Sequence, residues 1–179
     1  MIHESFDESV EMYLKTVCEL AAGSEGLVPI SALAKRLSVS TVSATEMVHR
    51  LCERGLLEHT PYKGVDLTQD GKRRALRVIR RHRLWECFLV DQLALPWQSV
   101  HDSACQLEHV TGRDVVEALA TFLDEPKVCP HGNPIPGPDG DIKIPQDCAL
   151  SELRPGEHGQ ITRVFPESTL LLDYLATHQ

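Results

Sequence analysis

Four side chains of the kinds that bind metal ions lie within nine residues of one another in the second half of the chain. They are His101, Cys105, Glu108 and His109, at positions i, i+4, i+7 and i+8. This spacing places all four on one face of a single helix. Because a thiol, a carboxylate and two imidazoles make a poor hydrophobic core but a good ligand set, the spacing predicts a metal site with mixed ligands.

Further donors must come from other elements, because one helix face supplies at most two or three ligands to one ion. One helix earlier, His82 and Glu86 stand four residues apart and can face the same region. Met12 lies almost opposite the apolar stripe of the first predicted helix, so its thioether can act as a soft ligand. We therefore predict a sulfur-containing site of Met12, Cys105, Glu108 and His109, and a harder N/O site of His82, Glu86 and His101.

The composition of these sites indicates which metals they suit. A mixed, mostly non-thiolate ligand set favours Fe(II), Mn(II), Co(II) or Ni(II) over structural zinc, and the sulfur donors favour iron at the first site. The six cysteines include no C-x-x-C pair, which argues against a disulfide framework and a zinc ribbon. Cys129 and His131 are further possible ligands, but their place in a proline-rich turn favours a structural role.

The charge of the chain is distributed very unevenly. Between residues 35 and 83 there are twelve Lys and Arg against five Asp and Glu, although the whole chain has a net charge of −8. A basic segment in an acidic chain is typical of a DNA-binding region joined to an acidic regulatory region. For the basic run over 72–83, a solvated helix face is the alternative interpretation.

The same segment has the pattern of a winged helix-turn-helix. A short helix over 30–37, a turn over 38–40 and a second helix ending at Gly55 precede two short strands, over 56–60 and 65–68. Serine and threonine near the start of the second helix can bond phosphates or base edges, but no arginine is there to make the commonest guanine contact. The residues expected to contact DNA are Lys35, Arg36, Ser40, Thr41, Ser43, Thr45, Arg50 and Lys63.

Helical spacing also predicts a first helix ending at Gly23, a long helix over about 69–93, and shorter helices over about 100–110 and 115–123. The short helices have broad apolar faces, which predicts burial against a second copy of the chain. Residues 126–145 hold six prolines and three glycines and are expected to form a linker or an irregular ordered loop. Residues 150–164 have the pattern of the opening strands of a small β-barrel, in a segment too short to close one.

The amino-terminal residues are acidic and lack the positive and apolar regions of a secretory signal. No apolar run approaches the length of a membrane span, which is about 20 residues. We therefore expect a cytoplasmic protein that does not bind membranes.

Several separated segments together resemble the diphtheria toxin repressor (DtxR) family of metal-dependent transcriptional repressors, in its iron-sensing branch. The likeness covers roughly residues 8 to 137. Besides the winged module, it depends on Glu11-Met12-Tyr13-Leu14, Leu67-Thr68 with Gly71, His82-Arg83-Leu84 with Glu86, Val100-His101-Asp102 with Ala104-Cys105, Glu108-His109-Val110, and Gly132-Asn133-Pro134-Ile135-Pro136-Gly137.

The resemblance assigns roles to the predicted donors. Met12, Cys105, Glu108 and His109 match the family's primary activating site, and His82, Glu86 and His101 match its ancillary site. The manganese-sensing branch has acidic residues at the places of Met12 and Cys105 and another acid at the place of Lys15, so this chain departs from that branch. In longer members an SH3-like domain adds ancillary ligands, and Glu167 is the nearest candidate for one here.

The fold class expected from pattern and resemblance together is mainly α. We predict a winged helix-turn-helix domain over 1–74, a helical metal-binding and dimerisation domain over 75–140, and a linker with a short β-containing remnant of an SH3-like domain over 141–179. The expected partners are a second copy of the chain and double-stranded operator DNA.

The expected function is a metal-activated repressor of metal homeostasis genes, with Fe2+ as cofactor. Mn2+ is the alternative cofactor, and Co2+, Ni2+ or Zn2+ can substitute in vitro. A second alternative is a metal-independent winged-helix regulator that senses oxidation through Cys105 or Cys129. An enzyme is not expected, because the chain has no H-E-x-x-H, nucleophile elbow or phosphate loop.

Overall fold

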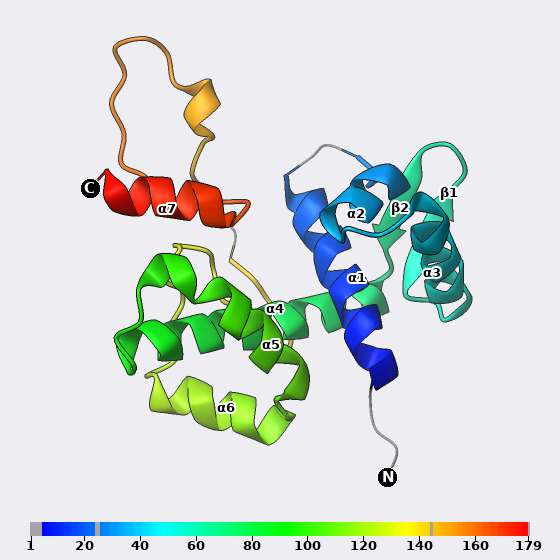
Figure 1. The fold of residues 1–179 in the computed structure, drawn as a ribbon, viewed down its shortest axis with the longest axis horizontal. Coiled ribbons are helices and arrows are strands. Elements are labelled where there is room, and N and C mark those ends of the chain that lie inside the picture. Colours follow the sequence, from blue (N-terminus) through cyan, green and yellow to red (C-terminus); the bar gives the residue numbers. More distant parts are fainter. Residues whose placement is uncertain (1–4, 24–25, 144, 179) are drawn as a thin grey trace. The chain divides into compact units, whose positions relative to one another are not determined.

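The computed structural model describes residues 5–23, 26–143 and 145–178, which form seven α-helices, two short 3₁₀ helices and one two-stranded sheet (Figure 1). The chain divides into two units, residues 1–79 and 80–179. Helix α4 (Gln69–Asp91) begins in the first unit and ends in the second. Among the described residues, no helix is both long enough and apolar enough to cross a membrane.

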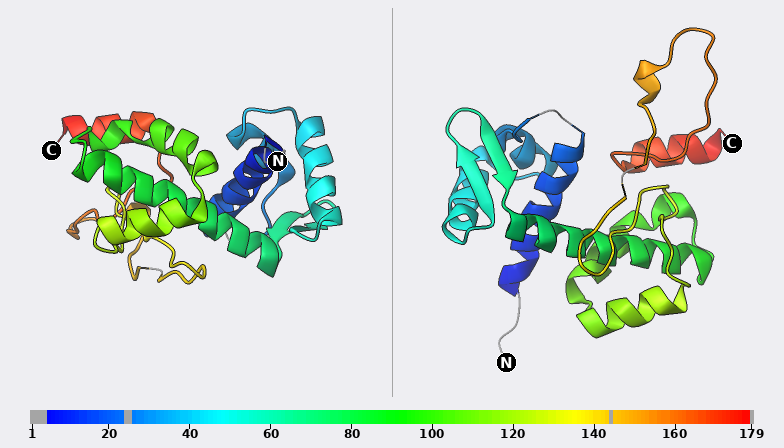
Figure 2. Two further views of the ribbon diagram at one scale, coloured as in Figure 1. Left: turned by 90° about the horizontal axis from the view of Figure 1, so that it is seen from below. Right: turned by 180° about the vertical axis from the view of Figure 1, so that it is seen from behind.

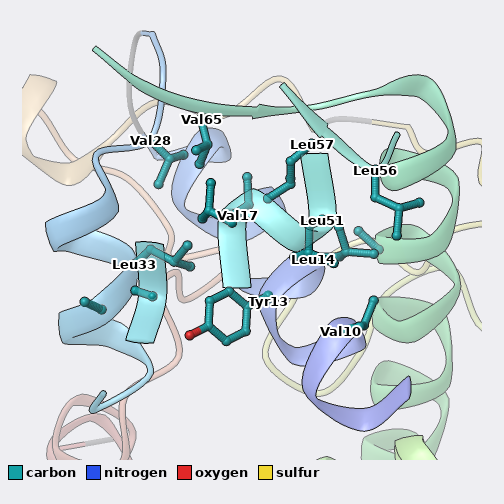
Figure 3. Packing of buried hydrophobic residues seen from close by; sticks show 14 residues of the cluster. Val10, Tyr13, Leu14, Val17, Val28, Leu33, Leu51, Leu56, Leu57 and Val65 are labelled. Carbon is teal, nitrogen blue, oxygen red and sulfur yellow. The ribbon is translucent and has the colours of Figure 1, made fainter. Parts of the chain in front are cut away.

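The core of the first unit forms around α1 (Ser5–Ala22). Val10, Tyr13, Leu14 and Val17 recur at helical spacing, and all four are buried, as the apolar stripe predicts. They pack with residues from the following helices and strands, including Val28, Leu33, Leu51, Leu56, Leu57 and Val65 (Figure 3). One continuous apolar cluster therefore fixes the elements of this unit.

The first unit has the predicted winged helix-turn-helix pattern. Helices α2 (Ile30–Arg36) and α3 (Thr41–Glu53) are followed by the antiparallel strands β1 (Leu57–Thr60) and β2 (Gly64–Leu67). The Ser40 hydroxyl accepts a hydrogen bond from the Ser43 backbone N–H and caps the start of α3. Thr68 caps α4 in the same way, since its hydroxyl accepts from the Gly71 N–H.

The second unit is built on the carboxy-terminal part of α4. Helices α5 (His101–Val110) and α6 (Arg113–Phe122) lie beside it (Figures 1 and 2). Leu84 and Cys87 of α4 pack with Val116 and Leu119 of α6 in one cluster. A smaller cluster joins α4 to the start of α5 and contains Leu89, Val100 and Ala104. This packing holds α4 and α5 side by side.

The proline-rich segment that follows α6 is an irregular, ordered loop, one of the two forms expected. Two buried arginines of α4 hold it, since Arg80 donates to the Pro136 carbonyl at 2.9 Å and Arg83 donates to the Pro134 carbonyl. Arg80 also pairs with Glu117 of α6 at 3.0 Å. These two arginines of the basic run are therefore structural, and neither the solvated-face nor the DNA-binding interpretation applies to them.

The predicted β-containing remnant over 150–164 is absent from the described residues. This part of the chain holds a 3₁₀ helix (Leu150–Glu152) and extended chain, followed by α7 (Thr169–Thr177). Most side chains between residues 149 and 163 are exposed, and the described part of the chain offers no neighbouring strand as a partner. An isolated short strand is not stable without a partner, so the predicted opening strands of a β-barrel do not form.

Candidate metal centre

His82 lies between two buried carboxylates at the place where α4 and α5 meet. Its Nδ1 atom is 2.6 Å from Glu108 Oε2, and its Nε2 atom is 3.0 Å from Glu86 Oε1. The side chain of His82 is 4% exposed, and both glutamates are fully buried. Glu86 comes from the same helix as His82, whereas Glu108 comes from α5. The helix packing thus brings together one donor from each of the two predicted sites.

His101 and Cys105 extend this cluster along α5. The Cys105 Sγ atom lies 3.8 Å from His82 Nδ1 and 3.7 Å from His101 Nε2. His101 presents its other nitrogen, Nδ1, at 3.2 Å from Glu167 Oε2 and 3.7 Å from Glu86 Oε1. Because these residues are four apart on one helix, the predicted shared face is confirmed for His101 and Cys105.

His109 follows Glu108 on α5, with Nε2 3.2 Å from Glu108 Oε1 and only 6% of its side chain exposed. Six of the seven predicted donors therefore belong to the second unit. The seventh, Met12, is a partly buried residue of α1 in the first unit. Its participation stays a prediction from the sequence.

Glu167 reaches the cluster from a segment that is distant in sequence. The Asn133 side-chain amide donates to Glu167 Oε1 at 2.6 Å and to the Val164 carbonyl at 2.9 Å. The Val164 N–H donates to the His131 carbonyl at 2.9 Å. These bonds dock the 162–167 segment on the loop that contains His131 and Asn133. The structure thus places the candidate ligand Glu167 beside His101.

Cys129 and His131 belong to the same cluster, although the sequence favoured a structural role for them. His131 Nδ1 lies 3.2 Å from Glu86 Oε1 and 3.6 Å from Glu167 Oε2. Its Nε2 atom is 2.8 Å from the Trp97 carbonyl oxygen, which can only accept, so Nε2 carries a proton. A histidine held this way by a backbone carbonyl is typical of metal ligands. The sequence signal for these two residues was their C-x-H spacing.

The charges within the cluster stabilise one another. Burial opposes ionisation of Glu86, but the charge of His82 and hydrogen bonds with three histidines outweigh it and hold the pKa of Glu86 well below its usual range. Burial also opposes ionisation of Glu167, but hydrogen bonds with His101 and His82 lower its pKa to about 2. Hydrogen bonds with Cys105, Glu167 and Glu86 raise the pKa of His101 to about 11.

Part of this donor set fits a metal ion both in chemistry and in arrangement, whereas Glu108 and His109 of the predicted primary site belong to none of the assembled groups. Within the described residues, three overlapping groups have ligand atoms within 4.8 Å of one another. One Glu86 oxygen, Oε2, is buried and has no hydrogen-bond partner in the described part of the chain, which leaves it available to a cation. The groups are His82, His101 and Cys105; His82, Glu86, His101 and Glu167; and Glu86, Cys129, His131 and Glu167.

The residues predicted to contact DNA lie on the surface of the first unit. All eight are exposed except Thr45, which is partly buried and whose hydroxyl donates to the Thr41 carbonyl at 2.8 Å. Lys63 is in the turn between the two strands, and the Ser40 hydroxyl is engaged as a helix cap. The surface exposure allows DNA contact for seven side chains, and their role stays a prediction.

Two family models match the chain in consecutive segments. The model described as the N-terminal DNA binding domain of iron dependent repressors matches residues 5–65. The model described as the iron dependent repressor metal binding and dimerisation domain matches residues 68–137. Their boundary falls at the start of α4. These matches confirm a winged helix-turn-helix followed by a helical dimerisation domain.

Named relatives agree with these matches. The iron-dependent repressor IdeR of Mycobacterium tuberculosis is 41% identical over 131 residues, which cover 73% of this chain and 56% of that protein. The chain therefore spans little more than half the length of the mycobacterial relative. The diphtheria toxin repressor of Corynebacterium diphtheriae is 35% identical over 173 residues, covering 90% of this chain and 76% of the relative.

Solved structures of similar proteins include one described as a manganese-dependent transcriptional repressor in complex with manganese. It superimposes with a TM-score of 0.88 at 37% identity and covers 94% of this chain and 78% of that chain. A structure of ScaR with bound Zn2+ superimposes with a TM-score of 0.80 at 33% identity. Relatives named for iron and for manganese thus share this fold.

Proposed function

Because the chain belongs to the diphtheria toxin repressor family of iron-dependent repressors, we propose that it is a DNA-binding transcriptional repressor that a metal ion activates. The observation that carries the proposal is the buried cluster in which His82 stands between Glu86 and Glu108. Buried charged groups add little stability compared with apolar side chains, so the cluster is better explained by ligand binding.

The physiological metal we propose is Fe2+. The thiol of Cys105 and the thioether of Met12 are softer donors than the carboxylates that Mn2+ prefers. Lys15 places a cation where the manganese-sensing branch has an acid. Mn2+ is the second candidate, because a manganese-dependent repressor is 37% identical to this chain. Co2+, Ni2+ and Zn2+ are expected to bind in vitro as well, since affinity rises along the divalent series.

The proposed activation joins the amino-terminal helix to the metal-binding unit. Met12 of α1 would hold the same ion as Cys105, Glu108 and His109, whereas His82, Glu86, His101 and Glu167 would hold the ancillary ion. Each bound ion would supply a positive charge that all donors of its site contact. The separate elements that carry these donors then favour one arrangement relative to one another. This shifts the population of the protein toward the form that binds DNA.

The DNA-binding form is proposed to be a homodimer. The matched metal-binding model also covers dimerisation, and Val110, Val115 and Phe122 of α5 and α6 are exposed large apolar side chains that a second copy can bury. Two winged modules related by two-fold symmetry read half-sites separated by helical turns of the duplex. The proposed partner is therefore a pseudo-palindromic operator in double-stranded DNA.

An anaerobic titration of Fe2+ and of Mn2+ against DNA binding tests this function. The probe is a duplex selected from a random pool by the Fe2+-treated protein, and fluorescence anisotropy reports binding. We expect Fe2+ to strengthen binding at least about 10-fold, within the range of typical allosteric coupling. Cys105→Ala and His109→Ala should abolish this response without changing the oligomeric state measured by light scattering.

Cys148→Ala is the matched control, because Cys148 is exposed and lies outside the cluster. It should respond to metal as the unmodified chain does. Equal DNA binding with and without metal in the unmodified chain would overturn the proposal. If that binding were instead lost on oxidation, the redox alternative would replace it. The buried position of Cys129, which raises the pKa of its thiol, already disfavours Cys129 as the redox sensor.

A further inference from the structure

We propose that Val42 and Glu46 of α3 read base pairs of the operator, Val42 through a thymine methyl group and Glu46 through the amino group of a cytosine. This inference rests on the proposed function, because it requires α3 to lie in the major groove as a recognition helix. It goes beyond that function by naming two side chains that determine the operator sequence and the bases that they select. Neither is among the eight residues predicted from the sequence to contact DNA.

Helix α3 turns one face inward and the opposite face outward. Ala44, Val48 and Leu51 are completely buried, which defines the inward face. With 3.6 residues per turn, the opposite face follows from the sequence. The side chains on it are all exposed and are Val42, Glu46, His49 and Glu53. Because the amino-terminal residues of a recognition helix contact the base edges, Val42 and Glu46 are the two placed to read bases.

The hydroxyl groups at the start of α3 are engaged within the helix. Ser40 Oγ accepts from the Ser43 N–H and lies 2.9 Å from Ser43 Oγ. The Thr45 hydroxyl donates to the Thr41 carbonyl at 2.8 Å. Ser43 and Thr45 also flank the outward face, on the sides where a helix in the major groove meets phosphates. Base reading is therefore left to the side chains of the outward face itself.

Glu46 offers the major groove a carboxylate, which accepts hydrogen bonds but cannot donate them. Within the described part of the chain, its side chain has no hydrogen bond or ion pair. Guanine and thymine present acceptors that repel a carboxylate, and adenine sets its amino group beside the N7 acceptor. Cytosine presents an amino donor alone. Since phosphates also repel the carboxylate, Glu46 should lower affinity for every duplex that lacks this cytosine.

The side chain of Val42 is apolar and 69% exposed. One exposed valine is ordinary on a protein surface, but this one lies one turn before Glu46 on the face that would enter the groove. The thymine methyl is the apolar group of the major groove. Four residues of helix rise about 6 Å, and base pairs are about 3.4 Å apart. We therefore expect a thymine within about two base pairs of the cytosine.

Selection from a random duplex pool in the presence of Fe2+, followed by sequencing, gives the base preferences of each variant. The unmodified chain should select cytosine at one position of each half-site. Glu46→Gln should change that base to adenine, because a glutamine amide pairs with adenine N6 and N7, and should leave the other positions unchanged. Glu53→Gln is the matched control, because it removes the same charge from the same face at the carboxyl end of α3. Its base preferences should equal those of the unmodified chain.

Anisotropy titrations measure the size of each effect. The unmodified chain should prefer cytosine over adenine at this position by at least about 5-fold, and Glu46→Gln should reverse the preference. Glu46→Ala should lose the preference and bind duplexes without the cytosine more tightly than the unmodified chain does. Replacing the thymine by uracil deletes only its methyl group. This should weaken the unmodified chain by about 4-fold, the effect of burying one methyl group, and leave Val42→Ser unaffected.

Unchanged base preferences in Glu46→Gln would overturn the role of Glu46. Selected half-sites without a nearby thymine, or an equal uracil effect in Val42→Ser and the unmodified chain, would overturn the role of Val42. Circular dichroism checks that the variants are folded, as the exposure of both side chains predicts. The proposed function is tested with one duplex by adding and removing Fe2+, whereas these ratios compare duplexes at one Fe2+ concentration. A chain that binds DNA without a metal response would thus lose the proposed function and still report its base preferences.

Discussion

At the scale of single residues, the metal centre is a set of buried charges that neutralise one another. Glu86 is completely buried, yet it stays ionised because histidines from α4, α5 and the proline-rich loop surround it. A buried carboxylate with no such partners would bind a proton instead. The histidines thus hold Glu86 in the ionised form that a divalent cation requires.

These pairings predict how the stability of the metal-free protein depends on pH. Folding raises the pKa of His101 from its ordinary 6.5 to about 11, so its contribution is complete below pH 6.5 and is lost as the pH rises toward 11. Folding lowers the pKa of Glu167 from 4.5 to about 2, so its contribution is lost as the pH falls from 4.5 to 2. Urea unfolding in the presence of a chelator, followed by tryptophan fluorescence, measures the free energy of unfolding against pH. The loss at high pH is the alkaline limb of this curve, and the loss at low pH is the acid limb.

His101→Gln should flatten the alkaline limb and leave most of the acid limb in place. His158→Gln is the control, because His158 is exposed and lies outside the cluster. It should follow the unmodified chain at every pH. If His101→Gln loses as much stability between pH 7 and 10 as the unmodified chain does, the assigned pairing of His101 is wrong.

At the scale of elements, docking of the 162–167 segment decides whether Glu167 reaches the centre. Gly132 has a φ of +81°, and a Cβ atom there would collide with the Thr162 carbonyl oxygen. Gly156 has a similar φ of +92°, but a Cβ atom there would meet nothing within 4 Å. The two glycines therefore share the same backbone requirement and differ only in their surroundings.

Gly132→Ala should displace the docked segment and weaken metal binding at the ancillary position by roughly 10-fold, the scale of losing a group that orients or supplies one ligand. Gly156→Ala should cost only backbone strain, about 1 kcal/mol of unfolding free energy, and leave metal affinity unchanged. Isothermal titration with Mn2+ measures the affinity, and urea unfolding measures the stability. Equal metal affinities in the two variants would show that docking does not position Glu167.

At the scale of the whole molecule, a chain with a net charge of −8 is proposed to bind a polyanion. The exposed basic residues of the first unit make this possible, because counterion release depends on local phosphate contacts and not on the net charge. Arg80 and Arg83 do not belong to that set, since both are buried against the proline-rich loop. The DNA-binding charge is therefore smaller than the basic run suggests.

Lys63→Ala should weaken binding to the selected duplex and to duplexes of altered sequence by the same factor, because a phosphate contact does not depend on the bases. The slope of log affinity against log salt should fall by about 1, because one phosphate contact is lost. Lys143→Ala is the control, since Lys143 is an exposed lysine of the second unit. Anisotropy titrations at several salt concentrations give both slopes. An unchanged slope in Lys63→Ala would exclude a phosphate contact from the wing.

The sequence alone determined the features that depend on residues close together in the chain, namely which side chains lie on one helix and where the helices and the strands of the winged module fall. Helical spacing put His101, Cys105 and Glu108 on α5 and His82 with Glu86 on α4, and apolar spacing predicted the elements of the winged module. Local spacing fixes these features because the backbone hydrogen bonds of a helix are local.

Only the tertiary structure decided which distant segments meet. The proline-rich loop and the 162–167 segment bring Cys129, His131 and Glu167 to the helices through backbone bonds whose partners no sequence pattern names. The β-strands predicted over 150–164 do not form, because a strand depends on a partner elsewhere in the chain. Contacts between segments far apart in sequence come from packing and docking, which periodicity within one segment does not encode.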